Sequence, residues 1–215
     1  MPRTTSTRTP AKMSTDWSEV QQLMSVVIVG HVGMVDEDGH PAVFPTAVVL
    51  DGERLLLHGS TGSPWLRRLA TGVPVSVAVT SIDAVVVART AFESSLSYRS
   101  AVFFGQCRTV PAEAADAALA VVTDRIIPGR VAEVRRSSRR ELAATLLLEL
   151  PVESWSLRIS SGPPTDEPED IAGDAWAGNL PIVRSYGQPA PSPDLRHGIP
   201  VPASVAGMLA GDVRV

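Results

Sequence analysis

The fold is decided by residues 25–58, which read SVVIVGHVGMVDEDGHPAVFPTAVVLDGERLLLH. Three apolar runs make up this segment: Ser25–Val35, His40–Leu50 and Arg54–His58. The first two runs are separated by a turn sequence that ends at Gly39, and Asp51-Gly52 follows the second run. β-Branched residues favour strands, and Asp-Gly between two apolar runs is a strong hairpin signal. The segment therefore predicts three antiparallel strands in sequence order.

The same texture of short apolar runs continues along the chain. Further strands are predicted at Pro74–Thr80, Ala84–Thr90, Tyr98–Val110, Leu146–Leu150 and Ser154–Ile159. Helices are predicted at Trp17–Met24, Trp65–Ala70 and Pro111–Ile127, with a helical turn at Glu141–Ala144. Many strands with few helices indicate a mainly β protein, either a closed β-barrel or a sandwich, with peripheral helices.

The two ends of the chain differ from this middle part. Residues 1–15 are polar and are expected to form a disordered tail, so the barrel domain is expected to cover residues 16–160. Residues 161–215 are rich in proline, which argues against both helix and central strand. Five apolar residues in this segment indicate that it packs as an extended arm on the barrel or on a partner subunit: Trp176, Leu180, Ile182, Ile199 and Val201.

Composition excludes several classes of protein. The 215 residues carry a formal net charge of −4, so the chain lacks the basic excess of a nucleic-acid binder and gains no attraction to an anionic membrane. The apolar runs are shorter than the ~20 residues of a membrane-spanning helix, and no apolar run follows the basic N-terminal residues as in a secretory signal. Cys107 is the only cysteine, which suits a reducing cytoplasm. We therefore expect a cytoplasmic protein, and the Ala, Val, Gly, Pro and Arg usage suggests a bacterial one.

The loop from His58 to Ser63 is the first candidate site. Gly59 and Gly62 let the backbone approach a ligand, and hydroxyl groups together with the N–H groups of a helix beginning near Ser63 could bind a phosphate. Arg67 and Arg68 follow one turn later and add positive charge, or are simply solvated. The alternative interpretation is an ordinary strand-to-helix turn. The loop is neither a P-loop nor a hydrolase nucleophile elbow.

Two arginines form the second candidate site. Arg89 and Arg99 lie at the ends of neighbouring predicted strands, so their guanidinium groups could converge on one anion. Alternatively, each arginine pairs across the strands with Glu93 or Asp83. The four histidines show no ligand spacing relative to one another or to Cys107, so no metal site is predicted, and Cys107 is expected to be a small buried residue.

Three blocks of sequence resemble one known family. They are Leu57–Ser63, Val85–Phe92 and Tyr98–Gly105, and their order and spacing are similar to those of the pyridoxamine 5′-phosphate oxidase-related flavin-nucleotide-binding proteins, including the nitroimidazole-resistance type. Glu141–Thr145 and Trp176–Gly178, with Pro181, agree as well, and the match runs from about Ser25 to Val205.

This resemblance implies a split β-barrel homodimer that holds two FMN molecules at the subunit interface. It places the flavin phosphate near Ser60, Thr61, Ser63 and Arg89, and the isoalloxazine or ribityl part near Ser100. The backbone of Pro45–Val48 would run beneath the ring, and Trp176 would reach it from the arm of either subunit. The full set of implied cofactor-binding residues is Pro45, Thr46, Ala47, Val48, His58, Gly59, Ser60, Thr61, Ser63, Arg89, Arg99, Ser100 and Trp176.

The sequence also departs from the family pattern. Many relatives carry two histidines after the phenylalanine of the second block and an asparagine before Tyr-Arg-Ser, whereas this chain has Glu93, Ser94 and Ser97. It also lacks a strongly basic cluster for a substrate phosphate, so true pyridoxamine-phosphate oxidase activity is not expected.

Three functions are compatible with the resemblance. The first is an FMN-dependent oxidoreductase that takes electrons from a nicotinamide cofactor or another donor and reduces a small oxidised compound. The second is a non-catalytic protein that binds or stores FMN, haem or a deazaflavin on the same fold. The third is a structural dimer whose loop binds only sulfate or phosphate. No catalytic residue is predicted.

Overall fold

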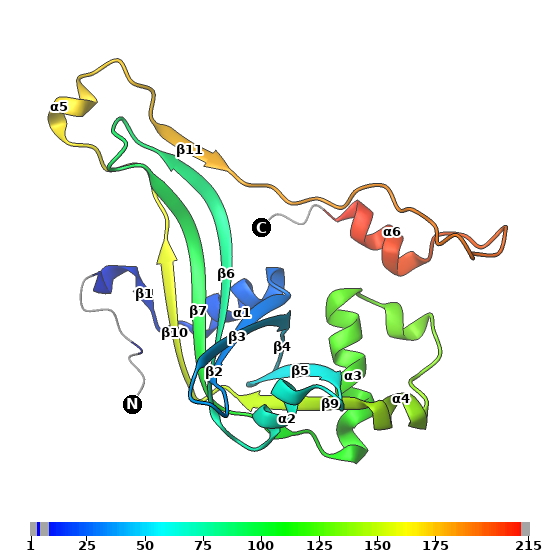
Figure 1. The fold of residues 1–215 in the computed structure, drawn as a ribbon. Helices are drawn as coiled ribbons and strands as arrows, with labels where there is room; N and C mark the ends of the chain where they lie inside the picture. Colours follow the sequence, from blue (N-terminus) through cyan, green and yellow to red (C-terminus); the bar gives the residue numbers. More distant parts are fainter. Residues whose placement is uncertain (1–3, 5–8, 212–215) are drawn as a thin grey trace.

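The computed structural model describes residue 4 and residues 9–211 (Figure 1). The strands are β1 Met13–Ser14, β2 Val29–Val35, β3 Pro41–Ala47, β4 Val49–Asp51, β5 Arg54–Ser60, β6 Pro74–Val87, β7 Ser95–Gln106, β8 Arg108–Thr109, β9 Thr145–Pro151, β10 Ser154–Ser160 and β11 Gly178–Pro181. The α-helices are α1 Trp17–Val26, α2 Pro64–Ala70, α3 Ala112–Ile126, α4 Arg139–Ala144, α5 Pro168–Ile171 and α6 Ala203–Ala210. Two short 3₁₀ turns are η1 Pro10–Lys12 and η2 Arg130–Ala132. The protein is mainly β with peripheral helices, as predicted.

The strands form two antiparallel sheets. The larger sheet has the order β1-β10-β7-β6-β2-β3, with β11 also paired to β6, and the smaller sheet has the order β4-β5-β9-β8. The chain passes between the sheets at two buried corners, Val48 between β3 and β4 and Cys107 between β7 and β8. At the first corner the Val48 N–H leaves the ladder and donates to the Ile28 carbonyl at 2.8 Å. Within the described residues no hydrogen-bonded pair joins the two sheets, so the closed barrel, one of the two alternatives drawn from the strand pattern, is not formed. The strands form two separate sheets, in agreement with the split β-barrel that the resemblance implied.

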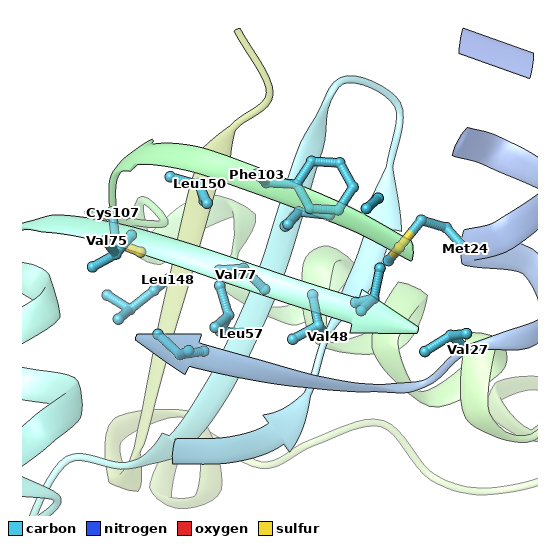
Figure 2. Packing of buried hydrophobic residues seen from close by; sticks show 14 of the residues in the cluster. Met24, Val27, Val48, Leu57, Val75, Val77, Phe103, Cys107, Leu148 and Leu150 are labelled. Carbon is cyan, nitrogen blue, oxygen red and sulfur yellow. The ribbon is translucent and has the colours of Figure 1, made fainter. Parts of the chain in front are cut away.

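The main core fills the space between the sheets (Figure 2). Phe103 of β7 and Val77 of β6 meet Leu57 and Leu148 from the smaller sheet, and all four are fully buried. Helix α1 adds Val20, Leu23 and Met24 to this core. Figure 2 shows both corner residues, Val48 and Cys107, among these side chains.

A second, smaller core lies on the other face of the smaller sheet. Val49, Leu56 and Leu147 pack there against Ala118 and Val122 of α3. Strands β5 and β9 are therefore buried on both faces, which explains why they read as continuous leucine runs and not as alternating patterns. The predicted helix at residues 111–127 is confirmed, since α3 spans Ala112–Ile126. The sequence offers Thr15 or Asp16 as the N-cap of α1, and the cap is Asp16, whose carboxylate accepts the Ser18 N–H at 2.8 Å.

Strand β6 is longer than predicted. Residues 74–80 and 84–90 were expected to form two strands, but β6 runs without a break from Pro74 to Val87 and forms a long hairpin with β7. The register with β7 shifts between Ile82 and Ala84, which is the mark of a β-bulge at Asp83. Residues 81–83, which separated the two predicted strands, therefore lie within one continuous strand. Strand β7 correspondingly starts at Ser95 and not at Tyr98.

The C-terminal arm contains more regular structure than its prolines suggested. Helices α5 and α6 contradict the expectation of an arm without helix. Each begins at a proline, Pro168 at the first position of α5 and Pro202 at the N-cap of α6, where proline does not interrupt a helical hydrogen bond. Strand β11 pairs with the distal half of β6 and lies at the edge of the sheet, where its Pro181 is tolerated (Figure 1).

The N-terminal segment is partly ordered. Met13 and Ser14 form β1, which pairs with Arg158 and Leu157 of β10, so residues 10–14 depart from the expected disordered tail. Residues 1–3 and 5–8 of that predicted tail lie outside the described residues. In the described part of the chain, no helix is both long and apolar enough to cross a membrane.

Candidate functional site

The loop between β5 and α2 has the predicted strand-to-helix form. Ser63 is the N-cap and Pro64 the first residue of α2, although the Ser63 side chain makes no capping hydrogen bond. The three N–H groups of Thr61, Gly62 and Ser63 are already used, by the Ala144 carbonyl at 3.0 Å, the Ser60 Oγ at 3.1 Å and the Ser60 carbonyl at 3.0 Å. A phosphate at this loop would therefore meet the hydroxyl groups of Ser60 and Ser63, and not a cradle of free loop N–H groups.

The two arginines of α2 have different roles. Arg68 donates from Nε to the Val35 carbonyl and from Nη2 to the Asp36 carbonyl, each at 3.0 Å, so it ties α2 to the turn between β2 and β3. Arg67 is exposed and lies one turn after Ser63. Arg67 is therefore the arginine of α2 that can face an anion at the loop.

The start of α2 is held against β3 by an aromatic pair. The rings of Phe44 and Trp65 stack with their centroids 4.8 Å apart and their planes 9° from parallel. Phe44 precedes the predicted flavin-facing segment 45–48, and Trp65 follows the loop. The structure thus brings two of the predicted site segments together in one chain.

Pro45, Thr46 and Ala47 lie on β3, an edge strand that pairs only with β2 among the described strands. Pro45 is exposed, whereas Val48 is buried at the corner. Only the backbone and the outer face of residues 45–47 are therefore open to a ligand.

His58 lies on β5 and is half-buried. Its Nδ1 is buried without a hydrogen-bond partner, and burial lowers the pKa of the imidazole. The ring is therefore held in its neutral form, which removes His58 as a positive charge for a phosphate. The neighbouring Gly59 leaves no room for a side chain, because a Cβ there would lie 2.5 Å from Leu66 Cδ1. The absence of a side chain at Gly59 thus allows close packing of α2 on β5.

Arg89 is paired with the arm. It follows β6, and its Nη1 contacts the Asp166 Oδ2 at 2.9 Å, while its backbone N–H donates to Oδ1 of the same carboxylate at 2.8 Å. The Asp166 side chain is only 1% exposed. The expected cross-strand partners, Glu93 or Asp83, are wrong for this arginine. The Arg89 Nε remains buried without a partner.

Arg99 makes the predicted cross-strand pairing. Its Nε and Nη2 contact the two carboxylate oxygens of Asp83 at 2.9 and 2.8 Å, and the Ser81 hydroxyl donates to the same carboxylate. Burial raises the pKa of Asp83, but the hydrogen bonds from Arg99 and Ser81 outweigh it and the net pKa is lowered. Arg89 and Arg99 therefore each have their own carboxylate and do not converge on one anion.

The positions that depart from the family pattern build the turn between β6 and β7. The Ser94 hydroxyl donates to the Thr90 carbonyl at 2.9 Å and accepts the Ala88 N–H at 3.1 Å. The Glu93 N–H donates to the Thr90 Oγ1, and Ser97 is buried. The Ser94 side chain thus has a structural role at the tip of the hairpin, whereas Glu93 contributes only its backbone N–H and Ser97 lies buried within β7.

Apart from Arg99 and Ser100, which pair with Ser81 and Thr80 in the middle of the β6–β7 hairpin, the predicted site residues fall into two separate groups within one chain. Residues 45–48 and 58–63 lie at the α2 end of β6, whereas Arg89 lies beyond its other end (Figure 1). Fourteen residues at about 3.3 Å each give roughly 45 Å of strand between these ends. Trp176, 67% exposed, lies with the second group beside Gly178 of β11. A single chain does not join the two groups.

A concave feature beside the arm was not predicted from the sequence. Two adjoining cavities of about 440 and 410 Å³ share Val26, Ile28 and Tyr186 as lining residues. We call them the arm cleft, because one wall comes from α1, β2 and the end of α3, and the other from residues 184–186 and α6. Ser100 adjoins it, since it pairs with Thr80, which lines the cleft. Its walls lie far apart in the sequence, so no local motif could reveal it.

One cluster of possible metal ligands is also present. Asp36, Asp38 and His40 offer ligand atoms within 4.8 Å of one another at the turn between β2 and β3. The Asp36 Oδ1 already accepts the N–H groups of Asp38 and His40 at 3.0 and 2.8 Å. These contacts account for the cluster as the framework of a turn.

Comparisons with known proteins agree on the fold. The family model described as pyridoxamine 5′-phosphate oxidase matches residues 16–159. The solved structure of the FAD- and haem-binding protein from Mycobacterium smegmatis is 48% identical, with a TM-score of 0.89 over 92% of this chain and 97% of that one. The flavocytochrome Anf3 from Azotobacter vinelandii is 27% identical, with a TM-score of 0.89 over 97% of both chains.

A protein from Bacteroides thetaiotaomicron, described as a 5-nitroimidazole antibiotic resistance protein, shares the fold at 16% identity, with a TM-score of 0.56 over 68% of this chain and 86% of that one. A search of the curated proteins gives no match. The family model covers two thirds of the sequence, and 92% of the chain shares the fold of the Mycobacterium smegmatis protein. The chain therefore belongs to the pyridoxamine 5′-phosphate oxidase family.

Proposed function

We propose that this protein binds a flavin nucleotide and transfers electrons through it. The observation that carries the proposal is the 48% identity to the FAD- and haem-binding protein of Mycobacterium smegmatis over nearly the full length of both chains. The flavocytochrome at 27% identity supports the same ligand class. The sequence led us to expect FMN, but the description of the Mycobacterium smegmatis relative favours FAD. A deazaflavin is the alternative cofactor that the test must distinguish from both.

The flavin site is assigned to residues 45–48 and 60–67. The hydroxyl groups of Ser60 and Ser63 and the guanidinium group of Arg67 supply donors for a phosphate, and the stacked Phe44 and Trp65 hold the loop against β3. The backbone of residues 45–47, on an edge strand, is open to a planar ring. These groups bind and orient the cofactor, and a bound flavin supplies the redox chemistry.

A second copy of the chain completes this site in our proposal. Arg89 and Trp176 lie at the far end of the β6–β7 hairpin, and Trp176 and Phe92 are 67% and 92% exposed there. Exposed aromatic side chains on a projecting hairpin suit burial against another subunit. A homodimer would bring the hairpin of one subunit to the loop of the other. Sedimentation equilibrium tests this step, and a monomer that retains full flavin affinity contradicts it.

Haem is proposed as a further ligand, because both relatives with a TM-score of 0.89 are described as haem or flavocytochrome proteins. In the proposed reaction, the bound flavin takes electrons from a donor such as a nicotinamide cofactor and reduces a small oxidised compound or oxygen. Pyridoxamine-phosphate oxidation is not proposed, since the site lacks a basic cluster for a second phosphate.

The first test is the absorbance spectrum of the purified protein, followed by mass identification of the released ligand. Absorbance bands of oxidised flavin and a released ligand with the mass of FAD or FMN support the proposal. Colourless protein that takes up neither FAD nor FMN contradicts it. A released ligand with the mass of a deazaflavin would show that the cofactor is a deazaflavin and not a flavin.

The second test locates the phosphate. Arg67→Ala and the double variant Ser60→Ala with Ser63→Ala should each weaken flavin binding about tenfold or more, because each removes hydrogen bonds to a charged group. Arg196→Ala, which removes an exposed arginine of the arm, is the matched control and should bind like the wild type. Unchanged affinity in both loop variants would show that the phosphate lies elsewhere.

A further inference from the structure

The arm cleft is built like a ligand site. Its two cavities together fall in the size range of cofactor pockets, and most of the lining is apolar, with Val26, Ile28, Ile126 and Met208 on its walls. None of the predicted flavin residues lines either cavity of the arm cleft. The arm cleft is therefore a separate feature from the loop at residues 60–67.

A histidine faces the cleft from β2. His31 lies on the outer face of this strand, opposite to the buried side chains of Val32 and Met34, and lines the cleft beside Thr80. Its neighbours across the ladder are small or cyclic, Ala78 on β6 and Pro45 on β3. The imidazole is therefore not crowded by its cross-strand neighbours, and imidazole is the commonest axial ligand that proteins offer to haem iron.

Two arginines supply positive charge at the cleft. Arg125 of α3 lines one cavity and Arg184 of the arm lines the other. Arg125 is half-buried and donates to the Met24 carbonyl at 2.5 Å, but it makes no ion pair with a carboxylate of the described residues. A guanidinium group stays charged when buried, so an anion from outside the chain would compensate it.

The arm wall is fixed by specific contacts. The Ser204 N–H and hydroxyl, at the start of α6, donate to the two carboxylate oxygens of Glu133 at 2.8 and 2.5 Å. Ser204 is buried, and Tyr186 of the arm is shared by both cavities. The cleft is thus a space between the body of the protein and a docked arm.

We propose that the arm cleft binds haem, with His31 as an axial ligand and with Arg125 and Arg184 receiving the two propionate groups. An apolar cleft suits the macrocycle, a neutral imidazole suits the iron, and two separate guanidinium groups suit two carboxylates. This assignment rests on the proposed function in one respect, namely that haem is a ligand of the protein. It names the residues that hold the haem, which the relatives' descriptions do not.

The test is a haem titration of the full-length protein followed by its Soret absorbance, with the ligation state read by magnetic circular dichroism. His31→Ala should lose the histidine-ligated spectrum, and added imidazole should restore it. His40→Ala, which alters an exposed histidine at the turn between β2 and β3, is the matched control and should keep the wild-type spectrum. A wild-type spectrum in His31→Ala overturns the assignment.

The arginines give an independent measurement. Arg184→Ala should weaken haem binding about tenfold, because it removes an interaction with a charged carboxylate. Arg196→Ala, another exposed arginine of the arm, should bind haem like the wild type. Equal haem affinities of Arg184→Ala and Arg196→Ala would overturn the role of Arg184. This measurement does not depend on whether the His31→Ala variant folds.

Flavin binding is measured on the same variants by quenching of flavin fluorescence. His31→Ala and Arg184→Ala should retain wild-type flavin affinity, whereas Arg67→Ala should not. If both cleft variants lose flavin and keep haem, the cleft is the flavin site and the inference is overturned. Haem binding without flavin binding contradicts the proposed flavin function and leaves this inference standing. Flavin binding without haem binding contradicts this inference together with the proposal of haem as a ligand, and leaves the flavin function standing.

Discussion

The body, residues 16–160, and the arm, residues 161–211, are held in place by different forces. Every apolar residue that is fully buried in the described structure belongs to the body. In the arm Ser204 is the one buried residue, and it is polar. The arm is attached through β11, the Arg89–Asp166 pair and the Ser204–Glu133 contacts. We therefore expect that the arm can detach when a few polar contacts are lost, while the body remains folded.

The largest effect is expected in the core of the body. Phe103 is fully buried between the sheets, so Phe103→Ala should lower the free energy of unfolding by about 3–5 kcal/mol. The matched control is Phe92, which is 92% exposed at the tip of the hairpin. Phe92→Ala should change the free energy of unfolding of the monomer by less than about 0.5 kcal/mol. Denaturant unfolding followed by fluorescence measures both. Similar losses in the two variants would contradict the division between core and hairpin tip.

A smaller and local effect is expected at the first attachment point of the arm. Asp166→Asn removes the charge that pairs with Arg89 and should weaken docking of the arm by about 1–3 kcal/mol. Hydrogen exchange should then rise in residues 163–182 and stay unchanged in β5 and β9. Asp174→Asn changes an exposed aspartate of the same arm and serves as the control. A cooperative loss of protection throughout the body would show that the arm is part of one folding unit.

How far the sequence predicts these two regions depends on the distance between interacting residues. The turns at Gly39 and Gly52 and the cap at Asp16 are local, and the helix and hairpins that they indicate are present. The partner of Arg89 is 77 positions away in the arm, so the expected nearby carboxylates, Glu93 and Asp83, were wrong. The continuity of β6 through residues 81–83 was not predicted, because the Asp83 carboxylate is paired with Arg99 across the ladder, 16 positions away.

The candidate site shows the same limit. The Ser60–Ser63 loop and the cap position of Ser63 could be predicted, because glycine, serine and proline act on their own backbone. The arm cleft could not, because His31, Arg125 and Arg184 come from three segments that only the fold brings together. These three residues show no motif in the sequence, and they line one cleft only because the arm packs beside α1, β2 and α3.

The second attachment point of the arm should depend on pH. The Ser204 hydroxyl and N–H donate to Glu133, and these hydrogen bonds lower the pKa of its carboxyl group. A carboxyl group with a lowered pKa in the docked state stabilises docking above its ordinary pKa, and this contribution is lost as the pH falls through the lowered value. Hydrogen exchange of α6 should therefore increase in acid. Glu133→Gln should show weaker protection of α6 at neutral pH and little further change in acid. An equal acid response in Glu133→Gln would contradict this role.

The smallest expected effect is an absence of change at Cys107, which reports on the body alone. Burial at the corner between β7 and β8 raises the pKa of its thiol to about 11, so at pH 8 its thiolate fraction is lower than that of a free cysteine by a factor of roughly 100. Alkylation by iodoacetamide should be slow in the native protein and fast in denaturant. Asp166→Asn and Glu133→Gln should leave this rate unchanged, because they release the arm and not the core. Phe103→Ala should raise it, because the thiol becomes accessible whenever the sheets separate. Faster labelling in the arm variants would mean that docking of the arm also holds the corner of the barrel closed, and the two regions would then have to be treated as one.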